Sequence, residues 1–127
     1  MSSPEDAVRA YMTALNASDL EGIVAVFAAD GSVMADEFPS ATGQEQLRRL
    51  FAGIFKARSF GRELHVDRVI EEGDLASVQT HTTGTLTMLE TNTTIQGPSR
   101  ELWVLRRDGS GWLIVDYMFN RSERAGQ

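Results

Sequence analysis

The sequence predicts an α+β domain in which three N-terminal helices pack in the concave face of a strongly curved antiparallel sheet. Apolar residues recur with helical spacing as far as Phe55, and they alternate with a period of two from Arg62 onward. The 127 residues, 42% of them hydrophobic, suit a single domain over residues 1–127, with residues 122–127 as a flexible tail. A sheet wrapped over helices leaves a cone-shaped cavity open at one end, and we expect any function to lie there.

The first helix is predicted from a start signal and an apolar stripe. Ser3 can cap the helix, Pro4 loses no hydrogen bond at its first position, and Asp6 completes a capping box. The residues that follow at offsets of three, four and seven form one apolar face, made of Val8, Tyr11, Met12 and Leu15.

Two further helices begin at similar signals. Ser18 with Glu21 and Thr42 with Glu45 form two more capping pairs, and residues 29–31 are expected to end the second helix in a turn. The third helix has the clearest apolar stripe, formed by Leu47, Leu50, Phe51, Ile54 and Phe55.

The remaining segments are predicted to be strands joined by turns. A short strand is expected over residues 32–35, and a longer one with alternating apolar residues over 62–72. Residues 75–89 are rich in Thr and in β-branched side chains, which is typical of a long strand. The segments 101–107 and 112–120 flank an Asp-Gly-Ser-Gly turn and therefore predict a hairpin.

Composition excludes several classes of function. The chain has 12 Lys and Arg against 18 Asp and Glu, a net charge of −6, so neither nucleic acid nor an anionic membrane is expected as a partner. It has no cysteine and two histidines, so we expect no disulfide, no metal site and no cofactor. No apolar run is long enough to span a membrane and the first residues lack the pattern of a signal peptide, so a cytoplasmic protein is expected.

Two segments carry a resemblance to a known family. Residues 11–30, YMTALNASDLEGIVAVFAAD, resemble the opening of ketosteroid isomerases and their relatives in the nuclear-transport-factor-2-like (SnoaL-like) superfamily. Residues 100–109 and 112–120, RELWVLRRDG and WLIVDYMFN, are similar to a branch of small proteins, some of them encoded near enediyne and polyketide pathways. The resemblance covers about residues 4–121. It implies the fold but not the reaction, because proteins with this fold catalyse many different reactions.

The resemblance does not carry over the reaction of the isomerase. That enzyme uses a Tyr and a protonated Asp as an oxyanion hole and a second Asp as base, as a known example of pKa tuning. Its Tyr corresponds to Tyr11, but its base corresponds to Ala35, with Asp36 one position later, and its oxyanion Asp corresponds to Trp103. Classical ketosteroid isomerisation is therefore not expected.

The same resemblance implies which residues of each strand face the cavity. In each strand the implied residues are two positions apart, as one face of a strand requires. They are Gln79, His81 and Thr83 in the long strand, Glu101 and Trp103 in the next, and Asp116, Met118 and Asn120 in the last.

Asp116 and His81 are the candidates for an acid–base pair. A carboxylate within the apolar strand around Asp116 would be costly to bury without a partner or a task, and burial would raise its pKa toward the range that suits proton transfer. The alternatives are an exposed strand position for Asp116 and an ordinary structural hydrogen bond for His81.

Other candidates have similar alternatives. Tyr11 could donate a hydrogen bond to developing negative charge on an oxygen or simply pack in the core, and Glu101 could be a cavity carboxylate or pair with Arg100. Asp36 and Asn120 could position substrate or water, or lie in a solvated entrance and at a chain end. An aromatic and Met wall suited to a flat, apolar ligand is expected from Phe51, Phe55, Trp103 and Met118.

Two functions from different classes remain open. One is a cofactorless isomerase, cyclase, dehydratase or epoxide hydrolase acting by acid–base chemistry on a polycyclic or polyketide-like molecule. The other is a module that binds a small hydrophobic ligand or forms a dimer without catalysis. If His81 and Asp116 point away from the cavity, the binding function is favoured. A homodimer through the Thr-rich sheet face is implied by the resemblance.

Overall fold

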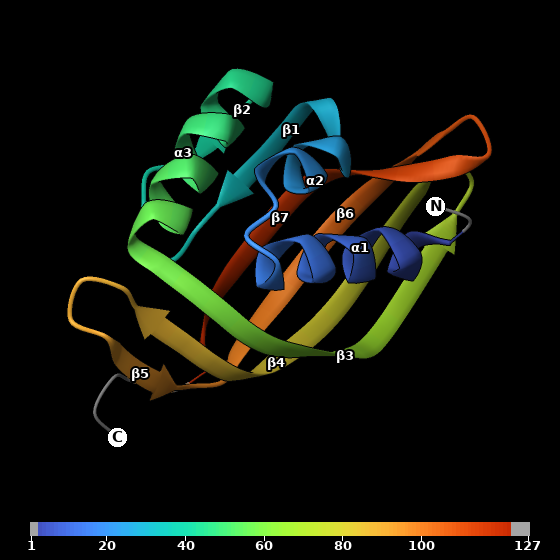
Figure 1. Cartoon of the computed structure of the whole chain (residues 1–127). Coiled ribbons are helices and arrows are strands. Elements are labelled where there is room, and N and C mark those ends of the chain that lie inside the picture. The colour runs from blue at the N-terminus through green and yellow to red at the C-terminus, as the bar shows by residue number, and fades with distance from the viewer. Residues whose placement is uncertain (1–2, 123–127) are drawn as a thin grey trace.

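Three helices and seven strands make up the described part of the chain, residues 3–122, in the computed structural model (Figure 1). The helices are α1 (Pro4–Asn16), α2 (Leu20–Ala25) and α3 (Gln44–Ala57). The strands are β1 (Phe27–Met34), β2 (Ala41–Thr42), β3 (Arg58–Glu72), β4 (Leu75–Met88), β5 (Thr93–Gln96), β6 (Ser99–Asp108) and β7 (Gly111–Arg121). The predicted α+β class is confirmed; residues 123–127 of the predicted tail lie outside the described residues.

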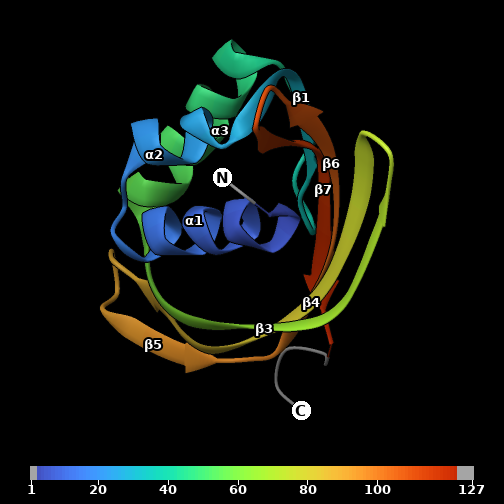
Figure 2. The ribbon, with the colours of Figure 1, turned by 90° about the vertical axis from the view of Figure 1, so that its right-hand side faces the viewer.

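All these strands belong to one sheet with the order β2-β1-β7-β6-β4-β3, and β5 pairs with the end of β4. The pairs are antiparallel except β1 with β7, which run parallel. The sheet is therefore mixed, whereas the sequence predicted a purely antiparallel one. The long strands β3 and β4 bend beneath α1, and the sheet thereby curves around the helices (Figure 2).

The observed N-caps of the three helices agree only in part with those predicted from the sequence. Ser3 caps α1 by accepting a hydrogen bond from the Asp6 amide at 3.2 Å, as predicted. The cap of α2 is Asp19 rather than Ser18, because the Asp19 carboxylate accepts from the Gly22 amide at 3.0 Å. α3 starts after Gly43 without a side-chain cap, because Thr42 belongs to β2.

Two strand boundaries also differ from the prediction. Residues 29–31, expected to form a turn, lie within β1, where the register with β7 shifts between Phe27 and Ser32. The segment Thr93–Gln96, for which no strand was predicted, pairs with β4 as β5. The first segment lies at a register shift, and the second forms a short strand off the main strand order. A short polar segment of sequence indicates neither feature.

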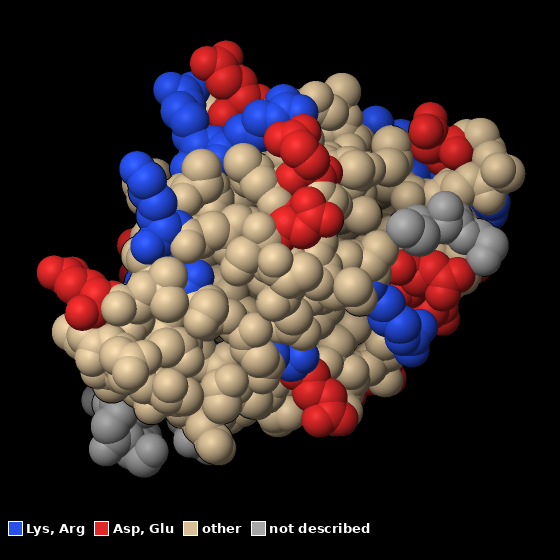
Figure 3. Space-filling model, in the orientation of Figure 1, with Lys and Arg blue, Asp and Glu red and all other residues tan. Residues whose placement is uncertain are grey.

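The core lies between the helices and the concave face of the sheet (Figure 2). Its largest fully buried side chains include Trp103 and Trp112 from the sheet, and Tyr11 and Leu47 from the helices. Among the described residues no helix is long and apolar enough to cross a membrane. On the face seen in Figure 3, acidic and basic side chains are interspersed around a broad uncharged region.

Candidate functional site

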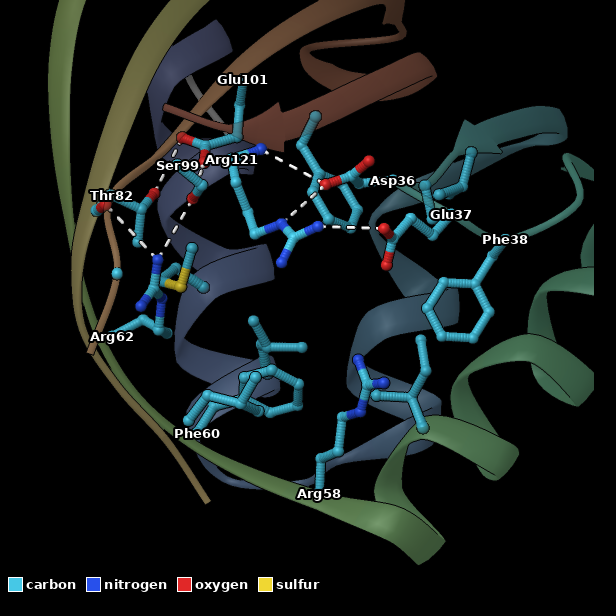
Figure 4. Close-up of a pocket in the computed structure, with 18 of the residues that line it drawn as sticks. Asp36, Glu37, Phe38, Arg58, Phe60, Arg62, Thr82, Ser99, Glu101 and Arg121 are labelled. Carbon is cyan, nitrogen blue, oxygen red and sulfur yellow. Dashed lines mark hydrogen bonds and ion pairs between the residues drawn. The ribbon is translucent and has the colours of Figure 1, made fainter. Parts of the chain in front are cut away.

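A cavity of about 350 Å³ lies between α1, α3 and the concave face of the sheet. This volume is at the lower end of the range of about 300–1,000 Å³ that is typical of ligand pockets. Most of its wall is apolar, with side chains from both helices and from β3, β4, β5 and β7, including Met12, Leu50, Phe51, Ile54, Phe60, Leu86 and Phe119. The polar groups are concentrated at a few positions, labelled in Figure 4.

Glu101 is the centre of the polar wall on β6, and it is only 4% exposed. Its Oε1 accepts hydrogen bonds from the hydroxyls of Thr80 and Thr82 at 2.7 and 2.8 Å, and its Oε2 accepts one from Ser99 at 2.5 Å. Trp103 Nε1 donates to Thr80 Oγ1 at 2.9 Å, so the Thr80 hydroxyl is both donor and acceptor. The buried carboxylate is therefore satisfied by three hydroxyls, as a buried charge requires.

Arg62 on β3 lies beside this network (Figure 4). Its guanidinium donates to the carbonyls of Gly84 and Thr82 at 3.0 and 3.4 Å and to Ser99 Oγ at 3.2 Å. The backbone of Arg62 is in turn fixed by the Asn16 amide at the end of α1, through bonds of 2.8 and 2.9 Å. Burial lowers the pKa of the guanidinium below its usual value, although the nearby Glu101 carboxylate opposes this shift.

A glycine is required where Arg62 contacts β4. Gly84 has a φ of 113°, and a Cβ at this position would collide with the carbonyl oxygen of Gly61 on β3. Gly84 thus permits the close approach of β3 and β4 beside the arginine.

Tyr11 and Tyr117 form a hydrogen-bonded pair on the cavity wall. Tyr117 stacks on Trp103 with ring centroids 3.7 Å apart and an angle of 8° between the planes, and Tyr11 meets both rings edge-on. Burial raises the pKa of both phenols well above the usual value of 10.0. The pair is therefore neutral at physiological pH, and it retains one O–H donor beyond the bond that the two hydroxyls share.

The opposite wall carries the other two acidic residues of the cavity, Asp36 and Glu37. Arg121 Nε lies 3.2 Å from Asp36 Oδ2, and its Nη2 lies 3.0 Å from Glu37 Oε1. Next to them the Arg58 guanidinium lies 5.3 Å from the centroid of the Phe38 ring, within cation–π range. Figure 4 shows that Asp36 and Glu37 are separated from Arg62 by the width of the cavity.

Four of the predicted site residues line the cavity: Tyr11, Asp36, Phe51 and Glu101. Trp103 lies directly behind the wall, fully buried beneath Tyr117. Phe55 packs against Phe51 and Phe60, with centroid distances of 6.2 and 6.5 Å, but it is not part of the cavity wall.

The predicted facing of β4 is wrong. Ala76, Val78, Thr80 and Thr82 are buried on the concave side, whereas Gln79, His81 and Thr83 are exposed on the outer face. His81 Nδ1 lies 2.9 Å from the Asp67 carboxylate, and its ring stacks on His65 at 4.7 Å. His81 therefore cannot reach a ligand in the cavity.

The predicted facing of the end of β7 is also wrong, for a different reason. Trp112 and Ile114 are buried, and so is Tyr117, so the inward positions change from even to odd numbers. The change occurs at a bulge, because β6 pairs Leu105 with Ile114 but Val104 with Asp116. As a result Asp116, Met118 and Asn120 lie on the outer face, where Asn120 accepts a hydrogen bond from Arg100 at 2.8 Å.

Several residues of the site were not predicted. Arg62, Tyr117, Ser99 and Arg121 line the cavity without having been candidates. The sequence does contain a signal for Arg62, which has the same parity as the apolar residues Leu64 and Val66 and thus shares their strand face. No comparable signal identifies Ser99 or Arg121, because both lie at strand ends.

In chemical terms the site is a small apolar cavity whose β3 and β7 walls present hydrogen-bond donors. Among residues 3–122 no group of three or more His, Asp or Glu side chains could hold a metal ion. Asp36 and Glu37 contribute carboxylates on the side of the cavity opposite Arg62.

A sequence profile described as the SnoaL-like domain matches residues 8–116. The chain belongs to this SnoaL-like family. The match covers residues 11–30 and most of the C-terminal region of resemblance, and it confirms the superfamily that the sequence suggested. No curated protein matches the chain in sequence.

Solved structures confirm the nuclear-transport-factor-2-like fold of this SnoaL-like domain. A ketosteroid isomerase-like protein from Erwinia carotovora atroseptica SCRI1043 has a TM-score of 0.90 at 28% identity, with 94% of each chain covered. A nuclear-transport-factor-2-like protein from Salmonella enterica serovar Typhimurium has a TM-score of 0.80 at 19% identity, covering 95% of this chain and 89% of that one. A provisionally named dehydratase from Streptomyces avermitilis has a TM-score of 0.75 at 17% identity, covering 94% of each chain. The fold family thus includes isomerases and dehydratases.

Proposed function

We propose that the protein binds a compact small molecule with a ring-bearing, apolar body in this cavity, without a cofactor. The observation that carries the proposal is the cavity of about 350 Å³ whose apolar wall has one polar region rich in donors. Arg62 and the tyrosine pair offer N–H and O–H groups there, so the ligand has an acceptor oxygen. The positions of His81 and Asp116 outside the cavity favour binding over the acid–base pair suggested by the sequence.

Filling the cavity tests this function. Ile54 lines the cavity from α3, and Ile54→Trp is expected to occupy the space of the ligand. The neighbouring Gly53 is exposed, and a Cβ added there has no other atom within 4 Å, so Gly53→Trp is a matched control on the same helix. A thermal-shift screen of bicyclic aromatic compounds, each with and without an oxygen substituent, should yield ligands for the native protein and for Gly53→Trp only.

The expected difference is at least about tenfold in Kd between the two variants, corresponding to about 1.4 kcal/mol. Equal binding by both variants, or no binding of any such compound by the native protein, contradicts a ligand in this cavity.

Acid–base turnover of the ligand is a second candidate. Asp36 supports it, because this carboxylate lies on the cavity wall and follows the position of the base in the isomerases that the chain resembles. Arg121 holds the carboxylate in place through its backbone N–H and its Nε. Such a base would remove a proton next to a carbonyl, as isomerisation, cyclisation and dehydration require, while a tyrosine O–H stabilises the oxygen.

Hydrogen–deuterium exchange tests this candidate. The native protein should accelerate the exchange of the α-protons of 2-tetralone in heavy water, and Asp36→Asn should reduce the rate by about 100-fold or more. An unchanged rate in Asp36→Asn excludes Asp36 as the base. If the native protein does not accelerate the exchange, acid–base turnover is excluded and binding is the remaining function.

The homodimer implied by the family remains a proposal. Its support is an apolar row on the outer face, in which Met34 pairs with Met118 and Met118 with Leu102 across three strands. All three side chains are about 40% exposed. Leu102→Arg should therefore shift a dimer to a monomer in sedimentation velocity, and a monomeric native protein at micromolar concentration contradicts the dimer.

A further inference from the structure

Charge is distributed unequally around the cavity. Three arginines and three carboxylates line it, so the wall as a whole is neutral. The β1 and β7 side carries Asp36 and Glu37 with a single arginine, Arg121, between them. The β3 side carries Arg58 and Arg62, with the apolar ring of Phe60 between them on the same face of the strand.

Arg62 differs from the ion-paired arginines of the molecule. The direct partners of these arginines are carboxylates at 2.9–3.6 Å, and the arginines are Arg48, Arg49, Arg106, Arg107 and Arg121. Within residues 3–122 Arg62 has no such direct partner, and the hydroxyl of Ser99 connects it to the Glu101 carboxylate. A half-buried guanidinium therefore borders the cavity without an ion-pair partner.

The donors of Arg62 are only partly used. A guanidinium has five N–H groups, and the bonds to Gly84, Thr82 and Ser99 account for three of them. Two N–H groups therefore have no acceptor within the described part of the chain. The backbone bonds to Asn16 and the carbonyls of β4 hold the arginine in place, so little freedom remains to be lost when a ligand binds.

Glu101 does not prevent a second carboxylate from binding. Its Oε1 already accepts two hydroxyls and its Oε2 accepts a third, and the residue is buried behind Ser99. The same cavity contains a precedent, since Arg121 lies between the carboxylates of Asp36 and Glu37. Arg62 can likewise lie between Glu101, through Ser99, and a carboxylate from a ligand.

We propose that Arg62 is the anchor for a ligand carboxylate, and that the ligand is a monoanionic aromatic or alicyclic acid whose ring body occupies the apolar cavity. This inference rests on the proposed binding function and narrows it to a chemical class. Glu101 is a positioning residue, because it acts on the ligand only through Ser99 and Arg62. The aromatic rings of Phe60, Tyr117 and Phe119 form the wall against which the ring body packs.

Two matched probes test the class of ligand. 2-Naphthoate and 2-acetonaphthone share a ring system, and they differ in carrying a carboxylate or a neutral ketone. The native protein should bind 2-naphthoate at least about tenfold more tightly in isothermal titration calorimetry, because hydrogen bonds to charged groups are the stronger ones. Equal affinity, or tighter binding of the ketone, overturns the inference while the binding function stands.

Substitution of the arginine tests the anchor. Arg62→Met should remove the preference for the acid, so that the affinities for 2-naphthoate and 2-acetonaphthone agree within about threefold. A cooperative urea-unfolding transition reports that the variant is folded. Arg62→Lys keeps the charge without the planar donor geometry and should retain an intermediate preference. Arg68→Met is the control, because Arg68 lies exposed on the outer face of the same strand.

The remaining outcomes are also decisive. A preference for 2-naphthoate that survives in Arg62→Met excludes the anchor. Loss of the preference in Arg68→Met would show that net charge alone attracts the acid, and this excludes a specific anchor as well. If the native protein binds neither probe, the proposed function fails, and the inference fails with it.

Discussion

The two faces of the sheet differ in which polar side chains they carry, and the difference is not the one that residue types alone suggest. The concave face has threonine, serine and tryptophan side chains around one carboxylate, all connected by hydrogen bonds of 2.5–2.9 Å. The outer face has the histidines, and the side chain of His81 is 48% exposed beside its Asp67 partner. Ordinary hydroxyls thus build the site, whereas the groups most often associated with catalysis lie in solvent.

This contrast shows that position on the sheet decides what a polar side chain can do. A buried hydrogen bond operates away from competing water, so its loss leaves a partner unsatisfied. An exposed contact such as that of His81 with Asp67 is open to solvent and contributes little to stability.

The largest difference is expected between adjacent residues of β6. Trp103→Ala should lower the free energy of unfolding by about 3–5 kcal/mol, because it removes a fully buried ring that stacks on Tyr117. Leu102→Ala, on the outer face, should change it by about 0.5 kcal/mol. Urea unfolding measures both values, and similar losses in the two variants would contradict the assignment of the faces.

The buried tyrosine pair predicts that stability depends on pH. Both phenols have pKa values raised by burial, so the unfolded chain loses these protons near pH 10.0 while the folded chain keeps them. The contribution of the two phenols to the free energy of unfolding is therefore fully present below pH 10.0. Above pH 10.0 the free energy of unfolding should fall by about 1.4 kcal/mol per pH unit for each tyrosine.

Urea unfolding between about pH 8 and 11 measures this decline. Tyr11→Phe should halve the slope, since the chain has only two tyrosines. A slope unaffected by this variant shows that other groups cause the decline.

A smaller difference is expected between two carboxylates. Glu101→Gln places an amide N–H₂ against a hydroxyl donor of the buried network and should cost about 1–3 kcal/mol. Asp116→Asn lies on the outer face and should leave both the unfolding midpoint and ligand binding unchanged. Loss of ligand binding in Asp116→Asn, with the fold intact, would restore the role first suggested by the sequence.

The smallest effect is expected for His81→Ala. The exposed pair with Asp67 should contribute about 0–1 kcal/mol, and ligand affinity should stay the same. Calorimetric titration with 2-naphthoate is the relevant readout, and a tenfold loss of affinity in His81→Ala is incompatible with a ligand in the cavity.

Much of the fold could be predicted from the sequence because its signals are local. The apolar stripe through Val8, Tyr11 and Leu15 depends only on neighbouring residues and is confirmed. The alternation in β3 is confirmed only as far as Val66, because a register shift before Arg68 turns Val69 toward the core and Ile70 outward. The parallel pairing of β1 with β7 joins segments about 85 residues apart, and no local pattern encodes it.

The faces of the strands illustrate two different limits. In β4 the alternation of apolar Ala76 and Val78 with polar Gln79 and His81 indicates the observed faces, whereas the resemblance to the isomerases implies the opposite facing. In β7 the pattern itself is misleading, because the bulge at Val115 reverses the facing of every later residue. The site was therefore predictable where strands are regular, as at Glu101, and not beyond the bulge.

A titration followed by nuclear magnetic resonance tests the central claim, that the ligand lies on the concave side of the sheet. The two tryptophan indole N–H signals and the two imidazoles each report on a known place. On addition of 2-naphthoate, the Trp103 indole, which donates to Thr80 behind the cavity wall, should shift, while Trp112 and both imidazoles stay unchanged. Shifts centred on His65 and His81, with Trp103 unaffected, would place the ligand on the outer face and contradict the account.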